Sequence, residues 1–133
     1  KKSNAGFYSY DDKGKRAGLW DGLEDKHAVA EDQPELPHVQ NRLMMAQVLE
    51  AVRALEEGVL EDIREGDVGA ILGWGFAPWS GGPFAWLDRI GEICEALSPE
   101  YGDRFAAPDL LREMAEKGES FYGRFGSETK TAA

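Results

Sequence analysis

The sequence contains very few of the residues that form disulfides or bind metals. Of its 133 residues, one is cysteine and two are histidine. The single Cys94 excludes an internal disulfide and is typical of a reducing compartment, so we expect a cytoplasmic protein. His27 and His38 stand eleven residues apart, with no cysteine partner and no metal-ligand spacing. We therefore predict no metal site.

Long apolar runs and an excess of positive charge are also missing. No stretch approaches the roughly 20 apolar residues that a membrane helix needs. Lys1 and Lys2 lead into a polar segment, so no signal peptide is visible. The net charge is −10. Such a surface repels phosphate backbones and anionic lipids, so we expect neither nucleic-acid binding nor membrane insertion. Because the chain does not start with Met, we interpret it as a piece of a longer protein.

Large aromatic rings are concentrated in one stretch, Ala70 to Gly91, which we call the aromatic corner. It holds three of the four tryptophans together with several glycines and two prolines. Large rings bury the most apolar area per residue, and Gly and Pro fix irregular turns. We expect a helix–turn–helix corner on which other helices pack. Such a corner on so small a domain predicts an exposed apolar patch and self-association of the isolated chain.

Helical periodicity dominates the rest of the sequence. The longest predicted helix runs from Val39 to Glu57, begins near Pro37 and ends before Gly58. Its expected apolar stripe consists of Val39, Leu43, Met44, Val48, Ala51, Val52 and Leu55.

Shorter helices are predicted on both sides of the turn in the corner. The first runs from about Glu61 to Leu72, with Asp62 as its cap and Ile63, Val68, Ile71 and Leu72 facing inward. The others are expected at Pro83 to Ile90, at about Glu92 to Leu97, and from Pro108 to a stop at Gly118. Alternating runs typical of strands are absent. The pattern predicts an all-α fold, a single helical domain of about five helices.

The two ends of the chain lack this periodicity. Residues 11–36 are charged and glycine-rich and are interpreted as a linker, and residues 126–133 as a disordered tail. Phe7-Tyr8 and Phe121-Tyr122 each follow a lysine and a small polar turn. This echo suggests that residues 1–10 end an earlier copy of the domain at 37–125, with chance similarity as the alternative.

No catalytic motif is complete. Gly73 and Gly75 begin like a dinucleotide fingerprint, but Pro78 replaces the third glycine and no strand precedes them. Ser80 lacks the surroundings of a nucleophile and fits a helix cap. Asp88 is expected to pair with Arg89 or Arg42. The sequence-adjacent acids Glu31-Asp32, Glu56-Glu57 and Glu61-Asp62 are interpreted as solvated faces, because neighbouring helix residues do not face each other.

Three segments resemble a known family. They are VQNRLMMAQVLEAVRALEEGV at 39–59, DVGAILGWGFAPWSGGPFAWLDRIG at 67–91 and KKSNAGFYSYDDKGK at 1–15. The first two are similar to the C-terminal helical domain of the L-3-hydroxyacyl-CoA dehydrogenase family. The closer match is to the second of two such domains in multifunctional enoyl-CoA hydratase/3-hydroxyacyl-CoA dehydrogenases of fatty-acid β-oxidation. The third is similar to the segment that closes the first copy.

The resemblance implies a parent enzyme that oxidises L-3-hydroxyacyl-CoA to 3-oxoacyl-CoA with NAD. The catalytic residues and the NAD site would lie in a Rossmann domain outside this chain. Asn41 matches a family asparagine that assists catalysis in the first copy. In a second copy we interpret Asn41 as structural, with substrate handling as the alternative. The chain is expected to hold no catalytic residue and no cofactor.

The same resemblance implies the partners. They are the preceding helical copy and the Rossmann domain of the parent chain, and the thiolase β subunit as a further candidate. The chain would then be a structural, pseudo-dimerisation domain that stabilises the dehydrogenase. An alternative of another class is an independent helical interaction module that binds a peptide or small ligand at the aromatic corner.

Overall fold

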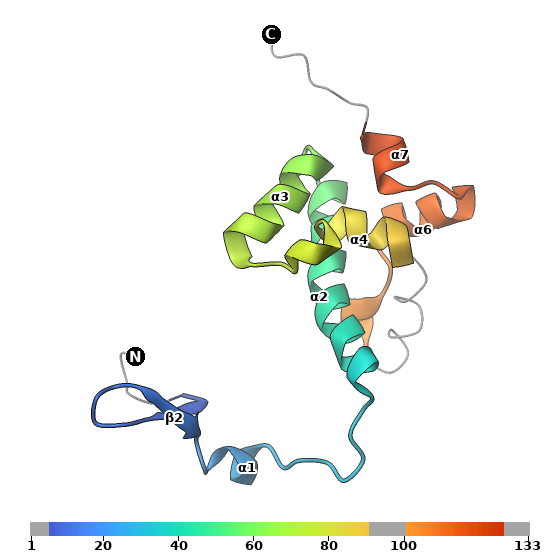
Figure 1. The fold of residues 1–133 in the computed structure, drawn as a ribbon. Helices are drawn as coiled ribbons and strands as arrows, with labels where there is room; N and C mark the ends of the chain where they lie inside the picture. The colour runs from blue at the N-terminus through green and yellow to red at the C-terminus, as the bar shows by residue number, and fades with distance from the viewer. Residues whose placement is uncertain (1–5, 91–100, 127–133) are drawn as a thin grey trace. The chain divides into compact units, whose positions relative to one another are not determined.

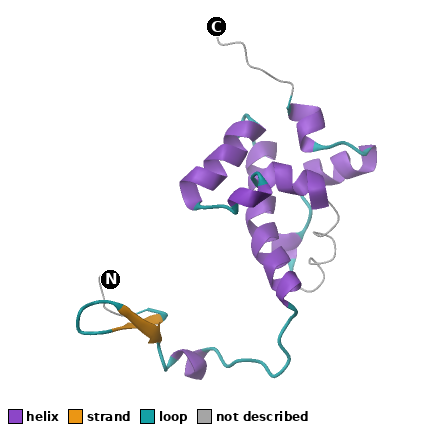
Figure 2. Cartoon of the chain, in the orientation of Figure 1, coloured by secondary structure: helices purple, strands orange, loops and turns teal. Residues whose placement is uncertain are grey.

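The computed structural model describes residues 6–90 and 101–126. The chain divides into two compact units, residues 1–34 and 35–133. The first contains a small two-stranded sheet and the second consists of helices and loops (Figures 1 and 2). The expectation of an all-α domain is confirmed by this mostly helical structure. No helix within the described ranges is long and apolar enough to cross a membrane.

The first unit contains a β-hairpin, so the expectation of no strands was wrong. Strand β1 (Tyr8–Tyr10) pairs antiparallel with β2 (Arg16–Leu19). The Asp11 carboxylate accepts hydrogen bonds from the backbone N–H groups of Lys13 and Lys15, at 3.0 and 2.8 Å. Gly14 has a φ of +73°, which favours glycine. Turn chemistry in Asp-Asp-Lys-Gly therefore forms the hairpin where alternation is too short to be seen.

After the hairpin, the first unit contains a single helical turn, α1 (Leu23–Lys26), which has no buried residue. Both β2 and α1 fall within residues 11–36, the range interpreted as a linker. The sequence echo is not matched by local structure either. Tyr8 begins a strand, whereas Phe121 and Tyr122 begin a helix.

Helix α2 (Leu36–Glu56) is the long helix of the second unit. Pro37 lies in its first turn, and Gly58, just beyond its end, has a φ of +70°, as expected. The expected stripe is partly wrong, because Leu43 is 64% exposed. The apolar residues are more numerous than one helix face can hold, so tertiary packing selects among them. The buried side chains are Met45, Val48, Leu49 and Val52.

Helix α3 (Ile63–Trp74) begins as predicted. The Asp62 side chain caps it by accepting a hydrogen bond from the N–H of Arg64 at 2.8 Å. Ile63 is buried as expected, but Val68 and Leu72 are 55% and 80% exposed. The prediction that these two face inward was wrong. The face that packs inward carries Asp67 and Ala70 instead.

The shorter elements follow in order. They are the 3-10 turn η1 (Pro78–Ser80), α4 (Pro83–Ile90), the 3-10 turn η2 (Asp103–Phe105), α6 (Asp109–Lys117) and α7 (Phe121–Phe125). Helices α4 and α6 lie where the sequence predicts them, and α6 ends at Gly118 with a φ of +63°. The helix expected at 92–97, and Cys94 with it, lies outside the described residues. The same holds for the expected tail beyond Gly126.

Helix α4 occupies the centre of the second unit. It packs against α2, α3 and α7, and Figure 1 shows it crossing the middle of α2. Phe84 on α4 is fully buried, and its ring centroid lies 5.2 Å from that of Phe121 on α7. Each such side chain contributes roughly 1.5–3 kcal/mol on burial. The aromatic corner is therefore the centre of packing, as predicted.

Candidate functional site

The aromatic corner turns through glycines in left-handed conformations. Helix α3 ends at Gly75, with a φ of +80°, and Phe76 then enters the core. Gly81 and Gly82, with φ of +87° and +110°, lead from η1 into α4. The buried Ser80 hydroxyl donates to the carbonyl of Ala77 at 2.6 Å and accepts from the N–H of Gly82 at 3.2 Å. Ser80 thus serves the turn, as its expected capping role implies.

Asp67 is the polar centre of this corner, and it escaped the sequence analysis. Its residue exposure is 2% although it lies in the middle of α3. Its carboxylate accepts hydrogen bonds from the N–H groups of Phe84 at 2.8 Å and Ala85 at 3.2 Å. It also accepts one from the Tyr122 hydroxyl at 2.8 Å. Asp67 therefore caps the start of α4 and joins it to α3 and α7.

Burial and this network shift two pKa values. Desolvation raises the pKa of the Asp67 carboxyl above its usual range, because burial penalises the charged form, while its three hydrogen bonds oppose the rise. Partial burial, helped by the bond to Asp67, raises the pKa of Tyr122 to about 12. The Tyr122 hydroxyl therefore keeps its proton at neutral pH and donates a hydrogen bond to Asp67.

One feature of the sequence could have pointed to Asp67. It is an acidic residue one helical turn after Ile63 and one before Ala70, on the face of α3 that is buried.

The close approach of Gly82 to Asp67 explains this glycine. A Cβ atom on Gly82 would overlap the Asp67 side chain. Gly66 permits a similar approach, since a Cβ there would lie 2.6 Å from a Leu60 methyl group and 2.8 Å from the Phe84 ring. Gly69, on the same helix, allows no such approach, since a Cβ there would meet nothing within 4 Å.

Two more acidic side chains cap helices from a distance. The Asp88 carboxylate accepts from the N–H groups of Phe121 at 2.6 Å and Tyr122 at 3.0 Å, at the start of α7. The expected pairing of Asp88 with Arg89 or Arg42 is not among the ion pairs of the described residues. The Glu56 carboxylate accepts from the N–H of Leu110 at 2.9 Å, in the first turn of α6. Glu56 therefore does more than form a solvated face.

The outer side of the corner is apolar and exposed. Trp79 is 86% exposed and Trp74 60%, and the Trp74 indole donates to the Gln47 side chain on α2 at 3.1 Å. We call the following set the exposed apolar face. It consists of Leu43, Val68, Leu72, Trp74 and Trp79. Large exposed apolar side chains often mark an interface when they lie together on a surface.

The features that could suggest a cofactor or a metal are the glycines at the end of α3 and the two histidines. Gly73 and Gly75 lie at the end of helix α3, not after a strand, so the geometry does not fit the phosphates of NAD. No cluster that could hold a metal ion occurs among the described residues. His38 is half-buried, and its Nε2 lies 2.8 Å from the Tyr101 hydroxyl. His27 lies in the first unit.

Asn41 is half-buried on α2, three residues after His38. None of the hydrogen bonds just described joins it to the Asp67 or Asp88 networks. The structural role of Asn41 stays a prediction.

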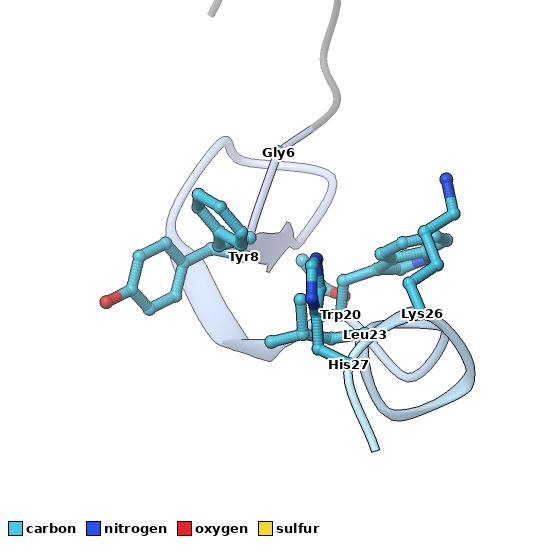
Figure 3. Close-up of a pocket in the computed structure, with 8 residues that line it drawn as sticks. Gly6, Tyr8, Trp20, Leu23, Lys26 and His27 are labelled. Atoms are coloured by element: carbon cyan, nitrogen blue, oxygen red, sulfur yellow. The ribbon is translucent and has the colours of Figure 1, made fainter. Parts of the chain in front are cut away.

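The first unit has a hollow of its own, about 470 Å³ in volume. Figure 3 shows Trp20, Leu23, Lys26 and His27 lying together there, while the Tyr8 ring points away from them. The Lys26 ammonium lies 5.5 Å from the centre of the Trp20 ring. Trp20 and Leu23 both line this hollow.

Comparison with known proteins relates the chain to a fatty-acid oxidation system. It is 41% identical over 130 residues to the fatty acid oxidation complex subunit alpha of Shewanella frigidimarina. It is 37% identical over 131 residues to the protein of that name from Shewanella amazonensis. Each match covers 92% of this chain but 18% of the relative, so the chain spans about a fifth of the relatives' length. No family model matches. The predicted resemblance is confirmed by these relatives.

Proposed function

We propose that this chain is the C-terminal structural domain of a multifunctional enoyl-CoA hydratase/3-hydroxyacyl-CoA dehydrogenase. The parent would oxidise L-3-hydroxyacyl-CoA to 3-oxoacyl-CoA with NAD held in a Rossmann domain outside this chain. The domain itself would be non-catalytic and would act as a pseudo-dimerisation partner of the preceding helical copy. The observation that carries the proposal is the match to fatty acid oxidation complex α subunits over 92% of the chain.

The chemistry of the corner supports a structural role. The carboxylates of Asp67, Asp88 and Glu56 all accept hydrogen bonds from backbone N–H groups at helix starts. A catalytic acid or base needs a lone pair or proton within reach of a substrate. Three donors occupy most of the lone pairs of the Asp67 carboxylate, which is almost fully buried. Helix capping by all three carboxylates supports a structural role for the domain.

The exposure of both units supports a larger parent. Residues 35–133 make up about three-quarters of the chain, so a match over 92% must include part of the first unit. In that unit Phe7 is 65% exposed, and α1 buries nothing. An isolated two-stranded hairpin is marginal in water. Packing of residues 1–10 on a preceding copy would cover the exposed rings.

The decisive experiment compares the isolated chain with the full-length parent. We expect the chain, supplied with 3-hydroxybutyryl-CoA and NAD, to produce no NADH absorbance above a blank, while the parent is active. Replacing Asn41 by Ala in the parent should leave acetoacetyl-CoA reduction unchanged. Turnover by the isolated chain would refute the non-catalytic role, and a large loss in the Asn41→Ala parent would assign Asn41 to substrate handling.

A second measurement tests the pseudo-dimerisation role. We expect the isolated chain to self-associate in sedimentation and to bind the dye ANS through the exposed apolar face. Leu72→Ser combined with Trp79→Ser should weaken both, because these side chains are 80% and 86% exposed and support no core packing. Trp20→Ser is the matched control in the first unit. A clean monomer that binds no ANS would contradict the proposal.

A further inference from the structure

A groove of about 510 Å³ lies along the N-terminal half of α2, beside Tyr101 and η2. Two arginines and one tyrosine supply its polar groups, and apolar side chains supply the rest. Its lining residues are Val39, Arg42, Leu43, Ala46, Tyr101, Arg104 and Phe105. The volume lies in the range of small-molecule sites. None of these residues takes part in the helix-capping networks around Asp67.

The groove is held open by contacts between α2 and η2. The Arg53 guanidinium donates to the carbonyl oxygens of Arg104 at 3.1 Å and Ala106 at 3.2 Å, which fixes the backbone of that segment against α2. His38 holds the Tyr101 hydroxyl at 2.8 Å, and the Tyr101 ring meets Phe105 edge-on at 6.0 Å. These contacts, which position the walls of the groove, do not involve the side chains of Arg42 and Arg104.

Arg42 forms no ion pair with a carboxylate among the described residues. Its guanidinium lies 3.7 Å from the centre of the Tyr101 ring, which fixes its plane. Its Nε is the one buried side-chain polar atom in the described part of the chain that lacks a hydrogen-bond partner. Unpaired buried donors are rare in folded proteins and call for an explanation.

Arg104 lines the same groove and forms no ion pair with the described residues either. By contrast, Arg53, Arg64, Arg112 and Arg124 are all paired with carboxylates. Acidic residues outnumber basic ones by 25 to 15 in this chain. Two arginine side chains that form no ion pair within the described part of the chain therefore line one groove and give it a local positive charge on an otherwise acidic protein.

We propose that this groove binds a small amphiphilic anion. A carboxylate or phosphate head group would pair with Arg42 and Arg104, since guanidinium forks match both anions. The apolar tail would lie against Val39, Leu43, Ala46 and Phe105. A stacked guanidinium loses little freedom on binding, which favours recognition of the head group. This inference is independent of the function proposed above.

The test is a titration of the full 133-residue chain, labelled with ¹⁵N, with decanoate below its micelle concentration. We expect saturable shifts of the Arg42 Nε–H resonance. Because charged hydrogen bonds contribute about 1.5–3 kcal/mol, Arg42→Gln should weaken decanoate binding about tenfold or more. Arg104→Gln, at an exposed residue, should weaken it without disturbing the fold. Arg112→Gln, on exposed α6, is the matched control and should bind like the wild type.

Two neutral or short probes complete the test. Decanol, which has the tail without the charge, and acetate, which has the charge without the tail, should both bind more weakly than decanoate. The proposal is overturned if Arg42→Gln and Arg104→Gln bind decanoate as the control does. It is also overturned if decanol or acetate binds as tightly as decanoate, or if the shifts are confined to Trp74 and Trp79.

Discussion

The two Phe-Tyr pairs of this chain show how differently its two units are built. Phe7 is 65% exposed and Tyr8 37%, and the hydrogen bonds around them join neighbours within one hairpin. Phe121 is 2% exposed, and Tyr122 reaches across to Asp67 on α3. The phenylalanine of the dipeptide is therefore a surface side chain in one unit and a core side chain in the other, whereas both tyrosines are partly exposed, Tyr8 by 37% and Tyr122 by 41%.

The difference lies in long-range partners. Asp88 accepts both N–H groups at the start of α7, and Phe84 packs on the Phe121 ring. Among the residues that the structure describes, the first unit has the Asp11 turn, but no hydrogen bond from a distant carboxylate reaches the hairpin and α1 buries no residue. Distant capping, combined with a shared core, converts short helices that are marginal alone into one packed unit.

The largest loss of stability is expected from a substitution at Gly82, which would disturb the packing of α3 against α4 in the second unit. Gly82→Ala places a Cβ against Asp67 at a φ of +110°. Overpacking and backbone strain should together cost about 3–5 kcal/mol of unfolding free energy in urea denaturation. Gly73→Ala is the control, since a Cβ there meets nothing within 4 Å. It should stabilise α3 by about 0.5–1 kcal/mol. Equal effects would contradict the close-approach role of Gly82.

Removing the distant cap itself should come next. Asp67→Ala leaves the N–H groups of Phe84 and Ala85 and the Tyr122 hydroxyl without their acceptor. We expect a loss of about 3 kcal/mol in the free energy of unfolding. Tyr122→Phe removes one of the three bonds and should cost about 1 kcal/mol. Glu116→Ala, on the exposed side of α6, should change little. A loss below that of Tyr122→Phe would show that Asp67 is not the centre of the network.

The pH dependence of the free energy of unfolding tests whether the Asp67 carboxylate is buried in the folded state. Because the pKa of Asp67 is raised in the folded state, the folded chain binds its proton more tightly than the unfolded chain. Its contribution to stability must therefore fall as pH rises from the ordinary value of 3.8 through the raised pKa, and then stay constant. Asp67→Asn cannot titrate. The stability of the wild type relative to Asp67→Asn should decrease over that window. A rise with pH would refute the burial argument.

The smallest effect is expected from the hairpin unit. Deleting residues 1–34 should change the unfolding free energy of residues 35–133 by less than about 0.5 kcal/mol, because each unit has its own contacts. Urea denaturation followed by the fluorescence of the remaining tryptophans measures it. A loss of several kcal/mol would show that the two units form one cooperative structure.

Sequence patterns predicted the helices well where local signals were strong. Pro37, Asp62, Pro83 and Gly118 mark helix ends through local backbone chemistry, and the structure places them there. Which face is buried was predicted poorly. Leu43 and Leu72 are apolar but exposed, because apolar residues cover more than one side of α2 and α3, and only packing against α4 selects the inner side.

The features of the candidate site also divide into those that the sequence predicted and those that only the tertiary structure revealed. By itself the sequence determined the aromatic corner, its irregular turn of Gly and Pro, and the resemblance to a helical domain of fatty-acid oxidation enzymes, since these depend on residues close together in the chain. Only the tertiary structure decided that Asp67 caps α4, that Asp88 caps α7 and that Arg42 meets Tyr101. Those partners lie 17 to 59 residues apart, and no local pattern encodes which backbone N–H or aromatic ring a distant side chain will reach.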